Sequence, residues 1–299
     1  MTIWLPFTLL AALFQSWRTA VQQKLRTELS VNAAGLVRYL YGLPAGVALL
    51  VVYLAARHAA IPAISSAFWV YCLAAGLVQI IGTNLLLLAF GYRNYVVGTA
   101  FAKTEAIQGA VLSMLILGEM LSPLTWAGIA IGVAGVMVVA AGGQRFRLAD
   151  LAQPAALCGL GAGLGFTMTS IFVKSATLDI ASADKILAAL ITLVAVNTGQ
   201  TIMQGGYVVL RERSEVAKIF RSWRISGQVG LLAALGSACW FTGFATAPVA
   251  LVRAVGQVEV VLTLLFGRLY LKEPIKASEA IGIALVGTGV AVALFGGWR

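Results

Sequence analysis

The chain has 299 residues, of which 60% are hydrophobic and only 11% are charged, and its formal net charge is +10. A soluble domain carries about 25% charged residues, so this composition excludes an ordinary soluble protein and predicts a polytopic membrane protein. The basic residues lie mostly between apolar stretches, where such residues set membrane topology and contact anionic lipid. The positive charge therefore does not indicate a nucleic-acid partner.

Apolar stretches long enough to cross a membrane follow one another along the whole chain. The first half predicts helices at about residues 4–25, 32–56, 67–91, 95–117 and 123–141, with a kink near Pro44. The second half predicts helices at about residues 155–176, 183–210, 225–245, 248–271 and 277–295. Residues 144–154 connect the halves, and the polar segment 211–224 is predicted to be an interfacial helix on a membrane surface.

No pattern of residues indicates a cofactor or a catalytic centre. The cysteines lie in separate predicted helices without a CxxC pair, and the one histidine, His58, lies in a loop without nearby carboxylates. The glycine-rich stretch at 159–165 lies inside an apolar helix with no strand before it, so it does not fit a dinucleotide-binding loop. We therefore expect no metal, no cofactor and no enzymatic activity.

The two halves of the chain repeat one another in sequence. Adding 154 to the numbers of residues 101–119 gives residues 255–273, and charged residues recur at this offset. The matching residues include the pairs Glu105/Glu259, Glu119/Glu273, Gly128/Gly282 and Gly135/Gly289. We predict two five-helix repeats, at residues 1–143 and 155–299. Because five is odd, the repeats must have opposite orientations in the membrane, as in many secondary transporters.

Two stretches carry a resemblance to a known family. LGEMLSPLTWAGIAIGVAGV at 117–136 and LKEPIKASEAIGIALVGTGV at 271–290 each place a Leu-x-Glu turn before a glycine-rich helix. With ten helices in two halves, the chain resembles the drug/metabolite transporter superfamily, in its EamA-type ten-helix branch. The resemblance implies secondary transport of small organic solutes by alternating access, through a cavity lined mainly by helices 1, 3, 4, 6, 8 and 9.

The sequence departs from this superfamily in two respects. The small multidrug-resistance branch uses an acidic residue in its first helix, and the first predicted helix here has none, so proton-coupled efflux of cationic drugs is not implied. Members of the ten-helix branch usually have cytoplasmic termini, whereas the basic residues of this chain place both termini outside by the positive-inside rule. Both orientations stay open.

Charged residues in the fourth helix of each repeat are the main candidates for the site. An ionised side chain deep in a membrane helix costs about 2.5–3.5 kcal/mol on insertion scales, so by default it faces a cavity or a partner. Thr99 and Lys103 share one face of the first such helix, and Arg253 and Gln257 share one face of the second. We expect these two faces to line the substrate cavity, with Lys103 as the strongest candidate for substrate contact.

The glutamates Glu105 and Glu259 point away from these faces. We expect them to pair with basic residues of neighbouring helices, for which Arg18 and Arg38 are candidates, or to couple transport to protons. The alternative is that all these charges form buried ion pairs that only hold the bundle together. Further side chains that could line the cavity are Gln15, Trp17, Arg18, Gln79, Asn84 and Trp240, although buried amides and tryptophans more often join helices or anchor them.

Cations inside the predicted helices outnumber acids, and a buried positive surplus needs an anion. The cations counted are Arg18, Arg38, Lys103, Lys174 and Arg253, against Glu105 and Glu259. We predict a secondary transporter for a small anionic or zwitterionic, amino-acid-like metabolite in a bacterial inner membrane. The alternative is a lipid-handling membrane protein, a flippase or an enzyme, that binds an anionic head group. Direction, coupling ion and oligomeric state, monomer included, stay open.

Overall fold

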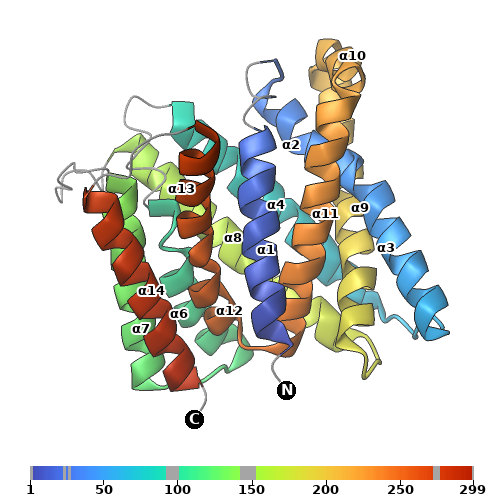
Figure 1. The fold of residues 1–299 in the computed structure, drawn as a ribbon. Helices are drawn as coiled ribbons and strands as arrows, with labels where there is room; N and C mark the ends of the chain where they lie inside the picture. Colours follow the sequence, from blue (N-terminus) through green and yellow to red (C-terminus); the bar gives the residue numbers. More distant parts are fainter. Residues whose placement is uncertain are drawn as a thin grey trace. The chain divides into compact units, whose positions relative to one another are not determined.

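The computed structural model describes residues 3–22, 25, 28–91, 101–141, 153–271 and 277–297. Within these ranges the chain is helical and contains no strand (Figure 1). It divides into two compact units, unit 1 from Met1–Ile80 and Phe172–Thr246, and unit 2 from Ile81–Ile171 and Ala247–Arg299. Each unit draws segments from both halves of the sequence. The boundaries of the sequence repeats, with the connecting segment almost wholly outside the described residues, stay a prediction.

Helices of both repeats make up each unit. Unit 1 contains α1 (Trp4–Gln22), α2 (Val31–Leu40), α3 (Gly42–Arg57), the first part of α4 (Ser66–Gly91), the end of α8 (Pro154–Asp179), α9 (Lys185–Arg211), α10 (Arg213–Arg221) and α11 (Trp223–Thr246). Unit 2 contains the remainder of α4 and α8, with α6 (Glu105–Leu117), α7 (Pro123–Ala141), α12 (Val249–Gly256), α13 (Val258–Leu271) and α14 (Ala277–Gly297).

Many of these helices have the length and composition of membrane spans. Seven stretches of the described residues qualify: Val31–Arg57, Ser66–Ala89, Pro123–Ala141, Pro154–Asp179, Lys185–Arg211, Trp223–Thr246 and Glu279–Gly297. Glu105–Leu117 is a shorter apolar helix. The prediction of an all-α polytopic membrane protein is confirmed.

The second predicted helix is interrupted near its proline. The α2 helix ends at Leu40 and α3 begins at Gly42, so the interruption falls at Tyr41, three residues before Pro44. Proline has no backbone N–H, so Pro44 cannot donate the hydrogen bond that the Leu40 carbonyl would otherwise accept in a continuous helix. The predicted kink is therefore present.

The fourth helix of each repeat is also interrupted, which the apolar pattern did not predict. Phe101 and Ala102 are helical, Lys103 and Thr104 form a turn, and α6 begins at Glu105. In the second repeat Gln257 separates α12 from α13. The offset of 154 places Lys103 on Gln257, so both helices break at the same position of the repeat. Discontinuous helices of this kind form the binding sites of many transporters.

The last helices of the two repeats, α7 and α14, pack backbone against backbone in unit 2 (Figure 1). A Cβ atom on Gly128 would lie 2.7 Å from the carbonyl oxygen of Gly289, and one on Gly135 would lie 2.8 Å from that of Gly282. Because the residue numbers run in opposite directions along the two helices, α7 and α14 are antiparallel. They are equivalent helices of the two repeats, so the repeats have the inverted relation predicted from the odd helix number.

Candidate functional site

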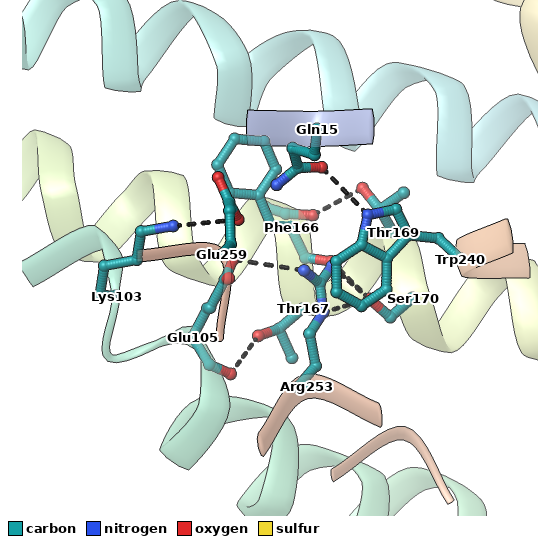
Figure 2. A network of polar contacts seen from close by, with 11 residues as sticks. Gln15, Lys103, Glu105, Phe166, Thr167, Thr169, Ser170, Trp240, Arg253 and Glu259 are labelled. Atoms are coloured by element: carbon teal, nitrogen blue, oxygen red, sulfur yellow. Dashed lines mark hydrogen bonds and ion pairs between the residues drawn. The ribbon is translucent and has the colours of Figure 1, made fainter. Parts of the chain in front are cut away.

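The site is built around the two broken helices of unit 2, where a lysine at one break meets a glutamate beside the other (Figure 2). Lys103 Nζ lies 3.4 Å from Glu259 Oε2, and the two side chains are 24% and 13% exposed. Glu259 stands in the first turn of α13, and Glu105 stands in the first turn of α6. The partial positive charge at a helix N-terminus stabilises a carboxylate at this position.

Arg253 of α12 forms the second ion pair of the site and is held more firmly than Lys103. Its Nη1 lies 3.5 Å from Glu105 Oε2. Its Nε donates to Ser170 Oγ across 2.9 Å, and its Nη2 donates to the carbonyl of Phe166 across 2.8 Å. Thr167 lies on α8, as Phe166 and Ser170 do, and its Oγ1 donates to the carbonyl of Glu105 across 3.0 Å. The α8 helix therefore holds both Arg253 and Glu105 in place (Figure 2).

These two ion pairs join the repeats and balance their charges. Lys103 and Glu105 belong to the first repeat, and Arg253 and Glu259 belong to the second, so each glutamate takes a cation from the other repeat. We call these four residues the charge network. The expected partners of the glutamates, Arg18 and Arg38, belong to unit 1, where the Arg38 guanidinium lies 5.5 Å from the centre of the Tyr39 ring, and their pairing with the glutamates stays a prediction. The cationic surplus expected from the sequence is absent from the charge network.

Amide side chains lie beside both breaks. Gln257, at the second break, is only 6% exposed, and neither of its amide atoms has a hydrogen-bond partner among the described residues. Its Oε1 occupies the space next to Gly132 of α7, where an added Cβ would lie 2.4 Å away. At the first break, Gln108 Nε2 donates to Thr104 Oγ1 across 3.0 Å. Asn84, another predicted residue of unit 2, is half-buried in α4.

The other predicted site residues lie in unit 1 or outside the described residues. Trp240 Nε1 donates to Gln15 Oε1 across 3.1 Å, which joins α11 to α1 (Figure 2). Gln79 accepts a hydrogen bond from Gln200 Nε2. Trp17 is 47% exposed on α1, and Arg18 beside it is half-buried. Thr99 lies outside the described residues.

A stripe of amides on α9 was missed by the sequence analysis. Asn197, Gln200 and Gln204 are all buried. Gln200 Nε2 lies 2.7 Å from Gln79 Oε1, and Gln204 Nε2 donates to the carbonyl of Asn32 across 2.9 Å. The signal was their spacing of three and four residues on an apolar helix, which places them on one face. Hydrogen bonds of this kind join helices inside membranes.

Comparisons with known proteins agree with this architecture. The model of the EamA-like transporter family matches residues 2–141 and 153–295, which leaves only the connecting segment and the ends of the chain unmatched. Among solved structures, the crystal structure of one protein aligns with 98% of this chain over 98% of its own length, at 19% identity and a TM-score of 0.73, which supports the fold alone. The comparison with curated proteins found no match. The chain belongs to the EamA-like transporter family and is therefore a multi-pass membrane protein that transports small molecules.

Proposed function

We propose that this transporter carries a zwitterionic, amino-acid-like molecule by alternating access, and that its charge network binds the substrate. The observation that carries the proposal is the balance of charge within the charge network, where Lys103 and Arg253 face Glu259 and Glu105. Each cation has a carboxylate partner within 3.5 Å.

The balance favours a substrate that carries both charges. Removing one partner of a buried ion pair costs several kcal/mol, about 3–5 in measured cases, because the other charge is left uncompensated. A simple anion would compensate the charge of Lys103 but would separate Glu259 from its lysine partner. A zwitterion can insert between the two, because its carboxylate accepts hydrogen bonds from Lys103 and its ammonium donates to Glu259. The network then stays neutral through binding and release.

The two ion pairs have different roles in this mechanism. Lys103 is the more exposed of the two cations, at 24% against 11% for Arg253, and it contacts Glu259 across 3.4 Å. Arg253 is fixed by Ser170 and Phe166 in addition to Glu105. We infer that the Lys103–Glu259 pair opens to admit substrate, whereas Arg253 positions Glu105 and keeps the two repeats in register.

Alternating access draws support from the inverted repeats and their matching breaks. Two equivalent helices, interrupted at Lys103 and at Gln257, contact each other in unit 2. Inverted repeats give a transporter two related conformations, one open to each side, with the site between them. The segments on either side of each break can then tilt without disrupting a continuous helix.

Blocked amino acids test the substrate class. Thermal unfolding of the purified protein is measured with a panel of amino acids, with their N-acetyl derivatives and with their methyl esters. We expect an intact amino acid to raise the Tm of the wild type, and both blocked forms to fail, because each lacks one charge. Lys103→Ala should abolish the shift. An N-acetyl derivative that stabilises equally well would show an anion transporter, and an equally effective ester would show a cation transporter.

The alternative of lipid handling draws support from one feature of unit 1. A cavity of about 340 Å³ between α3, α4 and α9 is lined almost wholly by apolar side chains, among them Leu50, Phe68, Trp69 and Ile191. Such a cavity fits part of an acyl chain. Phosphatidylcholine included in the same panel separates the readings, because stabilisation by this lipid and by no amino acid, unaffected by Lys103→Ala, would favour the alternative.

A further inference from the structure

The short helix α10 is held at one membrane surface by its two neighbours. Arg211 ends α9 and Trp223 begins α11, and both helices belong to stretches that can cross a membrane. The segment between them must therefore stay at the level where α9 leaves the membrane and α11 enters it. Figure 1 shows α10 at this end of α9 and α11, near α2.

The acidic residues of this segment face inward, onto the start of α2. Glu212 accepts a hydrogen bond from Asn32 Nδ2 across 2.6 Å and another from Ser30 Oγ. Glu215 accepts from the backbone N–H of Ser30 across 2.8 Å. Ile219, one turn further on, is buried in the core of unit 1. Glu212, Glu215 and Ile219 thus form the buried side of α10, at helical spacing.

The basic residues of the same segment face outward. All five of its cations are exposed, and we call them the basic face: Arg211, Arg213, Lys218, Arg221 and Arg224. Only Lys218 also contacts an acidic residue of the segment, Glu215, across 2.6 Å. Two large aromatic side chains lie among these cations, since Phe220 and Trp223 are each 59% exposed. The Arg224 guanidinium lies 5.5 Å from the centre of the Trp223 ring.

We propose that the basic face binds the head groups of anionic phospholipids in the leaflet that α10 lies against. Clustered Lys and Arg residues next to a membrane span are attracted to anionic lipid, and aromatic side chains favour the interface between head groups and acyl chains. A helix that faced water alone would leave Phe220 and Trp223 solvated, whereas the leaflet covers them. Because Glu212 and Glu215 tie α10 to Ser30, lipid bound outside also stabilises the start of α2.

The opposite end of unit 1 has no comparable cluster of cations among its described residues. Lys185 begins α9 there, and Arg57 ends α3 beside it. Two acids accompany them: Asp184 accepts a hydrogen bond from the Tyr53 hydroxyl across 2.8 Å, and Asp179 accepts one from Ser65. The two cations and two acids described at this end balance each other, so it provides a matched control.

Lipid titration of the purified protein tests the proposal. The protein is held in a neutral detergent, and its Tm is followed against phosphatidylglycerol, phosphatidylcholine or inorganic phosphate. We expect phosphatidylglycerol to raise the Tm at the lowest concentration, and high salt to weaken the effect. The variant Arg213→Gln/Arg221→Gln/Arg224→Gln should need on the order of a hundredfold more phosphatidylglycerol, since each cation near an anionic surface contributes roughly fivefold in affinity.

Two further variants separate charge from damage to the fold. Arg213→Lys/Arg221→Lys/Arg224→Lys keeps the charge and should respond like the wild type. Arg57→Gln/Lys185→Gln removes cations from the opposite end and should also respond like the wild type. The proposal is overturned if the three-glutamine variant responds normally, if phosphatidylcholine or inorganic phosphate stabilises as well as phosphatidylglycerol, or if the control variant at the opposite end loses the response.

Discussion

Lys103 of the first repeat contacts Glu259 of the second repeat, with 3.4 Å between Nζ and Oε2. The contact has a reciprocal counterpart, because Arg253 of the second repeat approaches Glu105 of the first. The glutamates are equivalent under the repeat, but each cation has an uncharged residue at its equivalent position. The site therefore combines a symmetric pair of acids with an asymmetric pair of cations. This asymmetry allows the two ion pairs to have different roles.

Removing charges singly and together separates the structural role of the Lys103–Glu259 pair from its role in transport. Lys103→Met removes the ion pair with Glu259, and we expect the free energy of unfolding to fall by about 1–2 kcal/mol, less than for a fully buried pair because both side chains are partly exposed. Lys103→Met/Glu259→Gln should recover most of this stability. Transport into vesicles should stay lost in both variants. Normal transport by the double variant would show that the pair is a structural contact with no role in transport.

Replacing Gln257 with an apolar residue should lower transport without lowering stability. The amide of Gln257 is buried and has no partner among the described residues, and an unsatisfied buried polar group costs about 1–3 kcal/mol. We expect Gln257→Met, which keeps the length of the side chain, to leave the Tm unchanged or raised while transport falls. Chemical and thermal unfolding give the stability, and vesicle uptake gives the activity. A variant that is less stable and fully active would contradict this assignment.

A pair of alanine substitutions on α14 tests the glycine contact with α7. A Cβ on Gly289 would lie 2.4 Å from the backbone nitrogen of Gly132, whereas a Cβ on Gly287 meets no atom within 4 Å. We expect Gly289→Ala to destabilise the protein by about 1–3 kcal/mol through overpacking. Gly287→Ala should be neutral or stabilise by up to about 1 kcal/mol, because alanine favours the helix. Equal Tm values for the two variants would rule out the close contact.

The contribution of Glu215 to stability should depend on pH. The hydrogen bonds from Lys218 and from the backbone N–H of Ser30 lower the pKa of Glu215 below its ordinary value. A carboxylate with a lowered pKa stabilises the folded state above the unfolded-state pKa, near 4.3 for a glutamate, and loses this effect as the pH falls through the folded-state pKa. The difference in Tm between wild type and Glu215→Gln should therefore be constant from neutral pH to about 5 and shrink below it.

A stability difference that grew on acidification would mean that the folded state favours protonated Glu215. In that case the ion pair with Lys218 and the contact with Ser30 would not persist in solution.

Hydrophobicity and the 154-residue offset were enough to predict most of the fold. Span-length apolar stretches predicted the helices, and recurring residues such as Gly128 and Gly282 predicted two related halves. The breaks at Lys103 and Gln257 were not predicted, because apolar residues flank both positions and a polar residue inside a membrane helix indicates a site or a partner without indicating a turn. Only the kink near Pro44 had a residue-level signal.

The partners of the charged residues were harder to predict than the residues themselves. Lys103, Glu105, Arg253 and Glu259 stood out in the sequence because charges are expensive inside a membrane helix. Which cation meets which acid depends on how the two broken helices cross, and no sequence spacing reports that. The contribution of Ser170 was missed for a related reason, since a hydroxyl in an apolar helix usually bonds to its own backbone.

The α7 and α14 helices contribute equivalent residues to their mutual contact. Gly128 faces Gly289, and Gly135 faces Gly282, so under the offset one pairing is simply the other with the repeats exchanged. A surface of this kind is self-complementary. A chain of five helices that inserted into the membrane in both orientations would form the same glycine contact with a second copy of itself, as an antiparallel homodimer. Joining two such copies end to end would preserve this glycine contact and leave each copy free to diverge in sequence, so that one could acquire Lys103 and the other Arg253.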